Sequence, residues 1–148
     1  MTRTYDVVAF QLPANIALPD DQRLWELDGT GRAVTGIMKL AQRVLLELLT
    51  VRGSRPFQQD TGTSLLAFIR QGIIRNEIDA HTYFQYAVTE LQQNLLLTQQ
   101  DTDPDDEVFA SLNVISLTFT PLQLSYRLKL LSRAGDSREL NLPVSTLP

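Results

Sequence analysis

The 148-residue sequence contains no cysteine and only one histidine. The absence of cysteine excludes disulfide bonds, thiolate catalysis and zinc sites with cysteine ligands. The lone histidine, His81, has no second histidine or cysteine with which to complete a zinc site, and no G-x-S-x-G sequence marks a serine nucleophile. We therefore expect His81 to be a surface or boundary residue, and we expect the chain to use no metal or cofactor.

Long hydrophobic runs and basic clusters are also missing. No segment approaches the roughly 20 apolar residues that a membrane-spanning helix needs. The short apolar run near the N-terminus contains Asp6, which does not fit a secretion signal. The net charge of −4 argues against nonspecific binding to DNA or anionic membranes, which requires clustered lysine and arginine. We predict a soluble protein that is not exported and that binds neither nucleic acid nor membrane.

The composition that is present is that of a globular protein. Hydrophobic residues make up 43% of the chain and charged residues 20%. A chain of this length can bury about two-thirds of the surface that its unfolded form exposes. We predict a single α+β domain over residues 1–148, with N-terminal strands at about 5–27, a helical part at about 34–99 and a C-terminal sheet at about 109–144.

Short strands are predicted near the N-terminus. Residues 5–10 are β-branched and aromatic, and residues 23–27 alternate before an Asp-Gly turn signal. These two segments suggest a hairpin or a pair of short strands. We interpret Trp25 as a core or rim residue, with a role as an anchor for a partner as the alternative.

Helical spacing begins at Val34. Apolar residues recur every three or four positions up to Leu49, whereas Lys39, Gln42 and Arg43 fall elsewhere on the helical wheel. We expect Gly53, with Arg52 just before it, to stop this helix at its C-terminus.

Two further helices are predicted after a polar loop. Thr63 and Ser64 offer a capping hydroxyl for a short helix, and Gly72 ends it. Asp79 is the expected N-cap of a longer helix with one apolar stripe that continues to Leu95. The prediction is therefore about three helices packed on a small antiparallel sheet.

Residues 99–107 are acidic and contain a proline, so an exposed loop is expected. Asp101, Asp103 and Asp105 imitate the start of a calcium loop, but the sixth position is not glycine and the twelfth is not glutamate, so a solvated linker is the preferred interpretation.

The C-terminal third alternates with a period of two, which predicts an antiparallel strand meander with one apolar face. A turn is expected at residues 134–137, and Pro143 limits the last strand to a sheet edge. We predict that Leu124, Tyr126, Leu128, Leu140 and Leu142 lie on strands at the edges of this meander.

One segment resembles a known family. Residues 50–65 read T-V-R-G-S-R-P-F-Q-Q-D-T-G-T-S-L. This segment resembles the baseplate wedge, or sheath-initiator, family of contractile phage tails, also called lysozyme-like wedge proteins and related to a type VI secretion baseplate subunit. The family pattern is a helix ending in threonine, then glycine, arginine, an often apolar pair, an acidic residue, and glycine followed by serine or threonine. The matching positions are Gly53, Arg55, Pro56, Phe57, Asp60, Gly62 and Thr63.

The resemblance also covers the order of elements over about three-quarters of the chain. Two positions depart from the family pattern. Thr61 stands where an aromatic residue usually precedes the second glycine. A Glu-Pro-Arg sequence in the long helix helps family members join neighbouring wedge proteins, but the best match here is Glu90-Leu91-Gln92, which keeps only the acid.

The resemblance implies a non-enzymatic structural protein of a virion tail baseplate, assembled in the host cytoplasm. Its partners would be the sheath protein, other wedge proteins, and tail tube or hub proteins, and open strand edges would receive the first sheath subunits by strand addition. Sheet edges that are simply covered by the N-terminal strands are the alternative. We further expect Arg55 and Asp60 to form an ion pair in the loop, or Arg55 to face solvent.

Two other functions remain open. A peptidoglycan-cleaving enzyme would need two carboxylates across a sugar cleft, and the spacing of the candidates does not select a pair among Glu47, Asp60, Glu77 and Glu90. A cytosolic regulator of the same fold, which sequesters a partner, is the other alternative.

Overall fold

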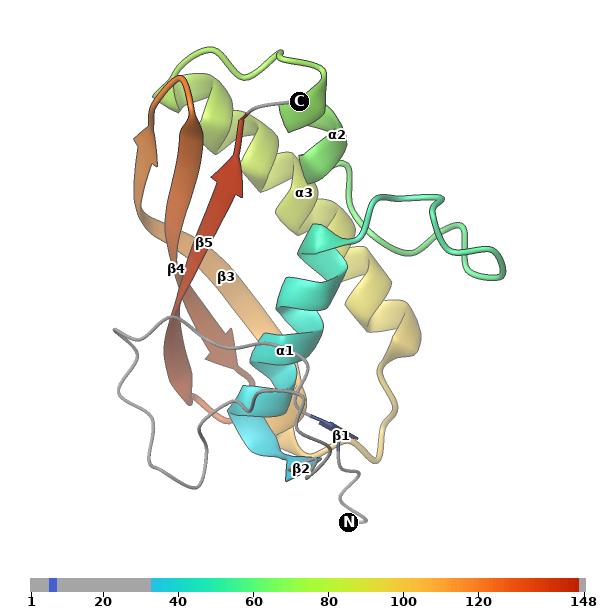
Figure 1. Ribbon diagram of the computed structural model, residues 1–148. Coiled ribbons are helices and arrows are strands. Elements are labelled where there is room, and N and C mark those ends of the chain that lie inside the picture. Colours follow the sequence, from blue (N-terminus) through green and yellow to red (C-terminus); the bar gives the residue numbers. More distant parts are fainter. Residues whose placement is uncertain (1–5, 8–32, 147–148) are drawn as a thin grey trace.

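The computed structural model describes residues 6–7 and 33–146 (Figure 1). Three α-helices and a three-stranded antiparallel sheet account for most of this part of the chain, which confirms the predicted α+β class with a C-terminal strand meander. In chain order, the elements are β1 (Asp6–Val7), β2 (Ala33–Val34), α1 (Gly36–Leu49), α2 (Leu65–Arg70), α3 (Glu77–Thr98), the short 3-10 helix η2 (Asp105–Glu107), β3 (Phe109–Phe119), β4 (Gln123–Ser132) and β5 (Ser137–Ser145).

The helices lie on one side of the sheet (Figure 1). The strand order is β3-β4-β5, so β4 is the central strand. Helix α3 packs against β3, α1 packs against β4 and β5, and α2 packs against both longer helices. This arrangement leaves the second face of the sheet to polar side chains such as Arg127 and Glu139, which form an exposed ion pair across β4 and β5.

The period-two pattern determines which face of the sheet is apolar. Side chains on β4 alternate between buried and exposed positions along most of the strand. The buried set joins one apolar core with the helices, and its largest members include Tyr126 and Phe84, whose rings stack at a centroid distance of 4.4 Å. Tyr126 Oη donates a hydrogen bond to Ala80 O at 2.9 Å, and burial raises the pKa of its hydroxyl.

Two predicted helix boundaries are wrong. Helix α1 ends at Leu49, and Gly53 instead forms a separate turn, with φ at +81° and Ser54 N donating to Val51 O at 3.0 Å. The N-cap of α3 is Asn76, whose Oδ1 accepts a hydrogen bond from Asp79 N at 2.8 Å. Asp79 lies in the first turn of α3, where its negative charge favours the positive end of the helix dipole.

The short helix α2 (Leu65–Arg70) confirms its predicted end and the predicted N-cap position, and Leu65 N donates to Thr63 Oγ1 at 3.5 Å. Gly72 follows its C-cap with φ at +68° and donates its N–H to Ile69 O at 3.1 Å. Ser64 is the N-cap residue, but its hydroxyl does not cap the helix. It donates instead to a glutamate of α3.

The predicted exposed loop at 99–107 is wrong at its end. Glu107 is buried, and its carboxylate accepts hydrogen bonds from Gly36 N at 3.0 Å and from Lys39 Nζ at 3.1 Å. Lys39 and Gln42, predicted on the polar face of α1, are buried as well. Across residues 6–7 and 33–146, no group of acidic, histidine or cysteine side chains is arranged to hold a metal ion.

The hairpin between β3 and β4 departs from simple alternation at two positions. A bulge in β3 between Val114 and Ser116 leaves the apolar residue Ile115 exposed. Leu122 precedes β4 and is also exposed, next to the turn closed by Thr120 N donating to Gln123 O at 2.9 Å. The predicted turn at 134–137 is confirmed between β4 and β5.

At the N-terminal side, β1 pairs antiparallel with β2, with Asp6 opposite Val34 and Val7 opposite Ala33. The other predicted N-terminal strand, at 23–27, and Trp25 lie outside the described residues. His81 is exposed, as predicted. Of the described helices, none combines the length and the hydropathy that crossing a membrane would require.

Candidate functional site

The segment that carries the family resemblance forms one structural unit, which we call the corner loop (residues 50–64, between α1 and α2). Its two ends are joined by backbone hydrogen bonds: Thr63 N donates to Thr50 O at 2.9 Å, and Arg52 N donates to Thr63 O at 3.2 Å. Val51 and Thr63 form an isolated parallel bridge between these ends. The loop therefore leaves and re-enters the helical layer at nearly the same place.

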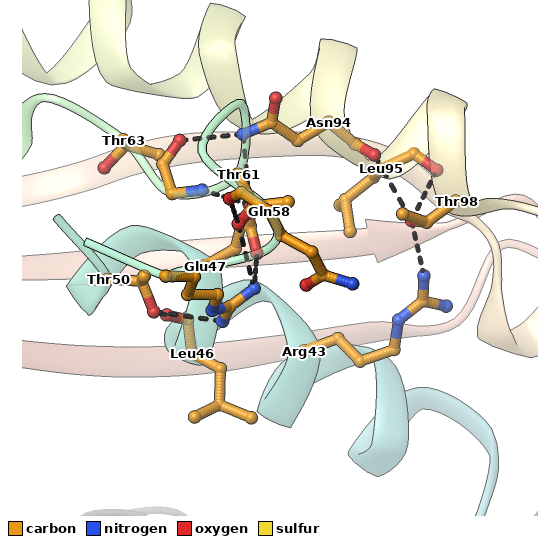
Figure 2. Close-up of polar contacts among 12 residues, drawn as sticks. Arg43, Leu46, Glu47, Thr50, Gln58, Thr61, Thr63, Asn94, Leu95 and Thr98 are labelled. Atoms are coloured by element: carbon orange, nitrogen blue, oxygen red, sulfur yellow. Dashed lines mark hydrogen bonds and ion pairs between the residues drawn. The ribbon is translucent and has the colours of Figure 1, made fainter. Parts of the chain in front are cut away.

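Glu47 holds the corner loop against α1 and α3 (Figure 2). Its Oε1 accepts hydrogen bonds from Gly62 N at 2.5 Å and from Asn94 Nδ2 at 3.0 Å. Asn94 Nδ2 also donates to Gly62 O at 2.7 Å, so both polar groups of the Gly62 backbone are satisfied. Because Glu47 and Asn94 are buried, these bonds connect the loop to two helices away from solvent.

Arg55 is the cation beside Glu47. Its Nη1 lies 3.6 Å from Glu47 Oε2, and its guanidinium donates to Thr50 Oγ1 at 3.1 Å and Thr61 Oγ1 at 3.3 Å. The predicted Arg55–Asp60 ion pair is therefore wrong, because Asp60 is exposed and its carboxylate forms no hydrogen bond or ion pair with the described residues. The hydroxyl of Thr61, the residue that departs from the family pattern, is a partner of Arg55.

Glu90 binds the other end of the corner loop. Its Oε2 accepts a hydrogen bond from Ser64 N at 2.7 Å, and its Oε1 accepts from Ser64 Oγ at 2.9 Å and Arg52 Nη1 at 3.1 Å. The loop is thus attached through one buried carboxylate on α1 and one on α3, and each carboxylate also has an arginine from the loop beside it.

Gly62 is the position where the backbone requires glycine. Its φ is +89°, in the left-handed region, and a Cβ atom added there would lie only 2.6 Å from Thr50 O. Gly53 also has a positive φ, but a Cβ atom added there would meet nothing within 4 Å. Gly62 is therefore fixed by conformation and close packing, whereas Gly53 is fixed by conformation alone.

Pro56 and Phe57 lie at the far end of the corner loop, away from this network. Both residues are exposed, and the Phe57 side chain is 99% exposed. They occupy the middle of a turn closed by Gln58 N donating to Arg55 O at 3.3 Å. Of the residues on which the family resemblance rests, the structure brings Arg55, Gly62 and Glu90 together at the helices, whereas Pro56, Phe57 and Asp60 lie outside this network.

The predicted strand-edge residues are corrected. Leu124, Tyr126 and Leu128 belong to β4, which has a neighbouring strand on both sides and therefore no open edge. Leu140 and Leu142 belong to the edge strand β5, but their side chains are buried in the core. Alternation correctly identified the apolar face of these strands, but it carries no information about strand order.

Hydrogen bonds at the two ends of the β4–β5 ladder show which residues of β5 face its outer edge. Ser132 N donates to Asp136 O at 2.9 Å, and Thr146 N donates to Leu122 O at 3.2 Å. Both bonds join even-numbered residues, and both pairs continue the register of the β4–β5 ladder. Because an antiparallel ladder uses every second residue, the even-numbered residues of β5, including Leu140 and Leu142, direct their backbone groups to β4.

The odd-numbered residues of β5 consequently direct their backbone groups outward. Pro143 belongs to this set, which suits a residue that has no N–H to donate and confirms its predicted place on an edge strand. Before Pro143, the outward N–H and C=O groups belong to Ser137, Glu139 and Asn141. Within the described part of the chain, no strand pairs with this edge.

Several residues of the corner were not found from the sequence as site residues: Thr50, Arg52, Thr61 and Asn94. Glu47 was considered only as one of four carboxylates. A signal for Glu47 existed, because it lies between Val44 and Leu48 in the apolar stripe of α1, where a charge must be paired to be buried. Asn94 had a weaker signal, one helical turn after Glu90 on α3.

The chemistry of the corner is that of a structural clamp. The oxygens of Glu47 and Glu90 already accept hydrogen bonds from the chain's own backbone and side chains. The other two carboxylates that the sequence suggested, Asp60 and Glu77, are exposed on the loop and at the start of α3.

Comparison of the chain with models of protein families, with curated proteins and with solved structures found no match. The resemblance to the wedge family therefore continues to rest on the residues of the corner loop and on the order of the elements.

Proposed function

We propose that the protein is a structural component of a contractile-tail baseplate and acts as a sheath initiator. In this role, an extended segment of the first sheath subunit pairs with the outer edge of β5 and continues the sheet. Other wedge proteins and tube or hub proteins are its further partners in the assembled particle. The observation that carries the proposal is the outer edge of β5, with which no described strand pairs and which carries the outward backbone groups of Ser137, Glu139 and Asn141.

The edge of β5 is a better template than the edge of β3. The register of β3 shifts twice, between Phe109 and Ser111 and between Val114 and Ser116, so its outward donors are irregularly spaced. The register of β5 is continuous from Ser137 to Ser145, and only Pro143 lacks a donor. A partner strand would therefore find its longest regular set of donors and acceptors on β5 before Pro143.

The corner loop supports the proposal by fixing the helices that carry the sheet. Glu47 belongs to α1, Glu90 belongs to α3, and both bind the same loop. These two helices cover the inner face of the sheet, so the clamp holds the sheet in a constant orientation relative to the loop (Figure 1). When the sheet is already rigid, less conformational entropy is lost as a partner strand binds to it.

The substitution Asn141→Pro tests the proposal, because it removes an outward N–H without touching the ladder to β4. With one hydrogen bond lost, we expect the fraction of baseplates that start a sheath to fall by about fivefold. Electron microscopy of particles assembled with the variant measures this fraction. Asn141→Ala, which keeps the N–H, should start sheaths normally.

Two results would contradict the proposal. If Asn141→Pro and Asn141→Ala start sheaths equally well while both remain folded, then β5 is not the template. If the protein is absent from the baseplate in a density map of the assembled particle, then the structural role itself is wrong.

A further inference from the structure

The Phe57 side chain is the most exposed large apolar side chain in the described part of the chain, at 99%. Its neighbours in the corner loop, Gln58, Gln59 and Asp60, are polar and exposed. Phe57 is therefore a single aromatic ring with a polar surround and does not belong to a wider apolar face. Such a ring fits a concave apolar pocket better than a flat surface.

Hydrogen bonds within the corner loop hold the turn that carries Phe57 in place. Pro56 precedes it at the position where proline presets the backbone of a turn, and Gln58 N closes the turn on Arg55 O. A second bond follows, in which Thr61 N donates to Gln58 O at 3.1 Å. The Arg55 guanidinium connects Thr50 and Thr61 at the base of the loop.

These hydrogen bonds fix the backbone that carries the ring before any partner binds. An anchor that is already ordered loses less conformational entropy on binding, so more of the gain from burying the ring appears as affinity. Glu90, the acid that the resemblance linked to attachment, is buried and bound by Ser64 and Arg52, so it is not free for a neighbouring subunit.

The corner loop projects from the helical side of the molecule, whereas β3, β4 and β5 lie on the other side (Figure 1). A partner strand on β5 and a partner pocket over Phe57 would therefore not compete for the same surface. We propose that Phe57 anchors this protein to a different protein subunit of the same particle by inserting its ring into an apolar pocket of that subunit. This inference rests on the proposed structural role and assigns a second, separate interface to it.

The surroundings of Phe57 favour a protein pocket over a lipid surface. The two arginines of the loop, Arg52 and Arg55, are paired with Glu90 and Glu47, so the loop offers no basic cluster to anionic lipid. One ring among glutamines has too little apolar area to hold a protein on a bilayer.

A competition experiment tests the anchor. Wild-type protein and the Phe57→Ala variant, with distinguishable tags, are produced together in cells that assemble the particle, and the tag ratio is measured in purified particles. Loss of an aromatic hot spot should lower incorporation of Phe57→Ala by about tenfold or more. Phe57→Leu should recover part of this loss. Gln59→Ala, in the same loop, should incorporate like wild type.

A photoreactive phenylalanine analogue at position 57 identifies the contact in the assembled particle. We expect a crosslink to a different chain, and equal melting temperatures of the isolated wild type and Phe57→Ala. Equal incorporation of Phe57→Ala would overturn the anchor while leaving the sheath role intact. A crosslink to a second copy of this chain, or to no protein, would overturn the choice of partner. Absence of the wild-type protein from particles would end both proposals.

Discussion

At the N-terminal end of α1, the Glu107 carboxylate accepts a hydrogen bond from Gly36 N and lies 3.1 Å from Lys39 Nζ. At the C-terminal side of the same helix, the carboxylate is Glu47, the backbone donor is Gly62 N, and the cation is Arg55 at 3.6 Å. Both glycines have a positive φ. Each end of α1 is thus joined to a distant segment by a glutamate, a glycine N–H and a cation.

The two ends differ in how far the ion pair is removed from water. The side chains of Glu107 and Lys39 are 2% and 11% exposed, whereas Arg55 is 36% exposed. In a buried pair, removing one partner leaves a charge without water or a counter-charge, but a partly exposed arginine can return to solvent. The corner also has Asn94 as a further donor to Glu47, so Glu47 keeps a polar partner when Arg55 is removed.

The largest expected effect is at the buried end. Glu107→Ala removes a counter-charge that lies 3.1 Å from Lys39 Nζ and an acceptor of Gly36 N, so we expect the free energy of unfolding to fall by about 3–5 kcal/mol. Chemical denaturation measures this loss. The double variant Lys39→Met, Glu107→Leu should recover much of the stability, because both members of this buried ion pair are then apolar. A single variant with near wild-type stability would contradict the description of this pair as buried.

Alanine substitutions at Gly62 and Gly53 distinguish the cost of backbone strain from the cost of close packing in the corner loop. Gly62→Ala forces both a left-handed alanine and a clash with Thr50 O, and we expect a loss of about 3 kcal/mol. Gly53→Ala shares the positive φ but meets no atom, so about 1 kcal/mol is expected. Thermal and chemical unfolding of the two variants measures the difference. Equal losses would mean that Gly62 is required only for its backbone angle.

The elements that follow from local patterns were predictable from the sequence. The spacing of apolar residues in α1 and the alternation in β4 place the helix and the apolar face of the strand, because periodicity reports directly on which side of an element is buried. The N-cap of α3 was predicted at Asp79 instead of Asn76 because both are good capping residues and lie close together in sequence.

The corner network and the outer edge of β5 could not be predicted from the sequence, because both depend on the tertiary structure. Glu47 and Asn94 meet at Gly62 although they lie on different helices, and only tertiary packing brings their side chains together. The expected partner for Arg55 was Asp60, its neighbour in sequence, but burial of Glu47 beside the loop base offered a better acceptor. Similarly, alternation shows the buried face of β4 but not that β4 is central.

Tyr126 forms a buried hydrogen bond between two uncharged groups. We expect its loss to have an effect intermediate between those of the ion pairs at the two ends of α1. Tyr126→Phe removes the bond to Ala80 O and should cost about 1 kcal/mol near neutral pH. Burial raises the pKa of Tyr126, so the folded state retains the proton more strongly than the unfolded state. Its contribution is therefore fully present below the unfolded pKa of about 10 and is lost as pH rises beyond that value.

Unfolding measured from neutral to alkaline pH checks the sign of this effect. Above pH of about 10, wild type should lose stability more steeply than Tyr126→Phe, so the gap between the two proteins should narrow. Tyr86→Phe is the matched control, because Tyr86 is an exposed tyrosine on α3. Parallel curves for wild type and Tyr126→Phe would contradict the assignment of the alkaline loss to Tyr126.

The smallest loss of stability is expected for Arg55→Ala, at the C-terminal side of α1, where the ion pair is partly exposed. Since more than a third of the Arg55 side chain is exposed, solvent screens its attraction to Glu47, and the loss should not exceed about 1 kcal/mol. The loss should shrink further at high salt, unlike that of Glu107→Ala. Arg55→Lys, which keeps the charge but cannot reach Thr50 and Thr61 with the same forked geometry, separates attraction from hydrogen bonding. A loss of several kcal/mol for Arg55→Ala, independent of salt, would mean that the corner behaves as a buried ion pair after all and that the two ends of α1 are equivalent.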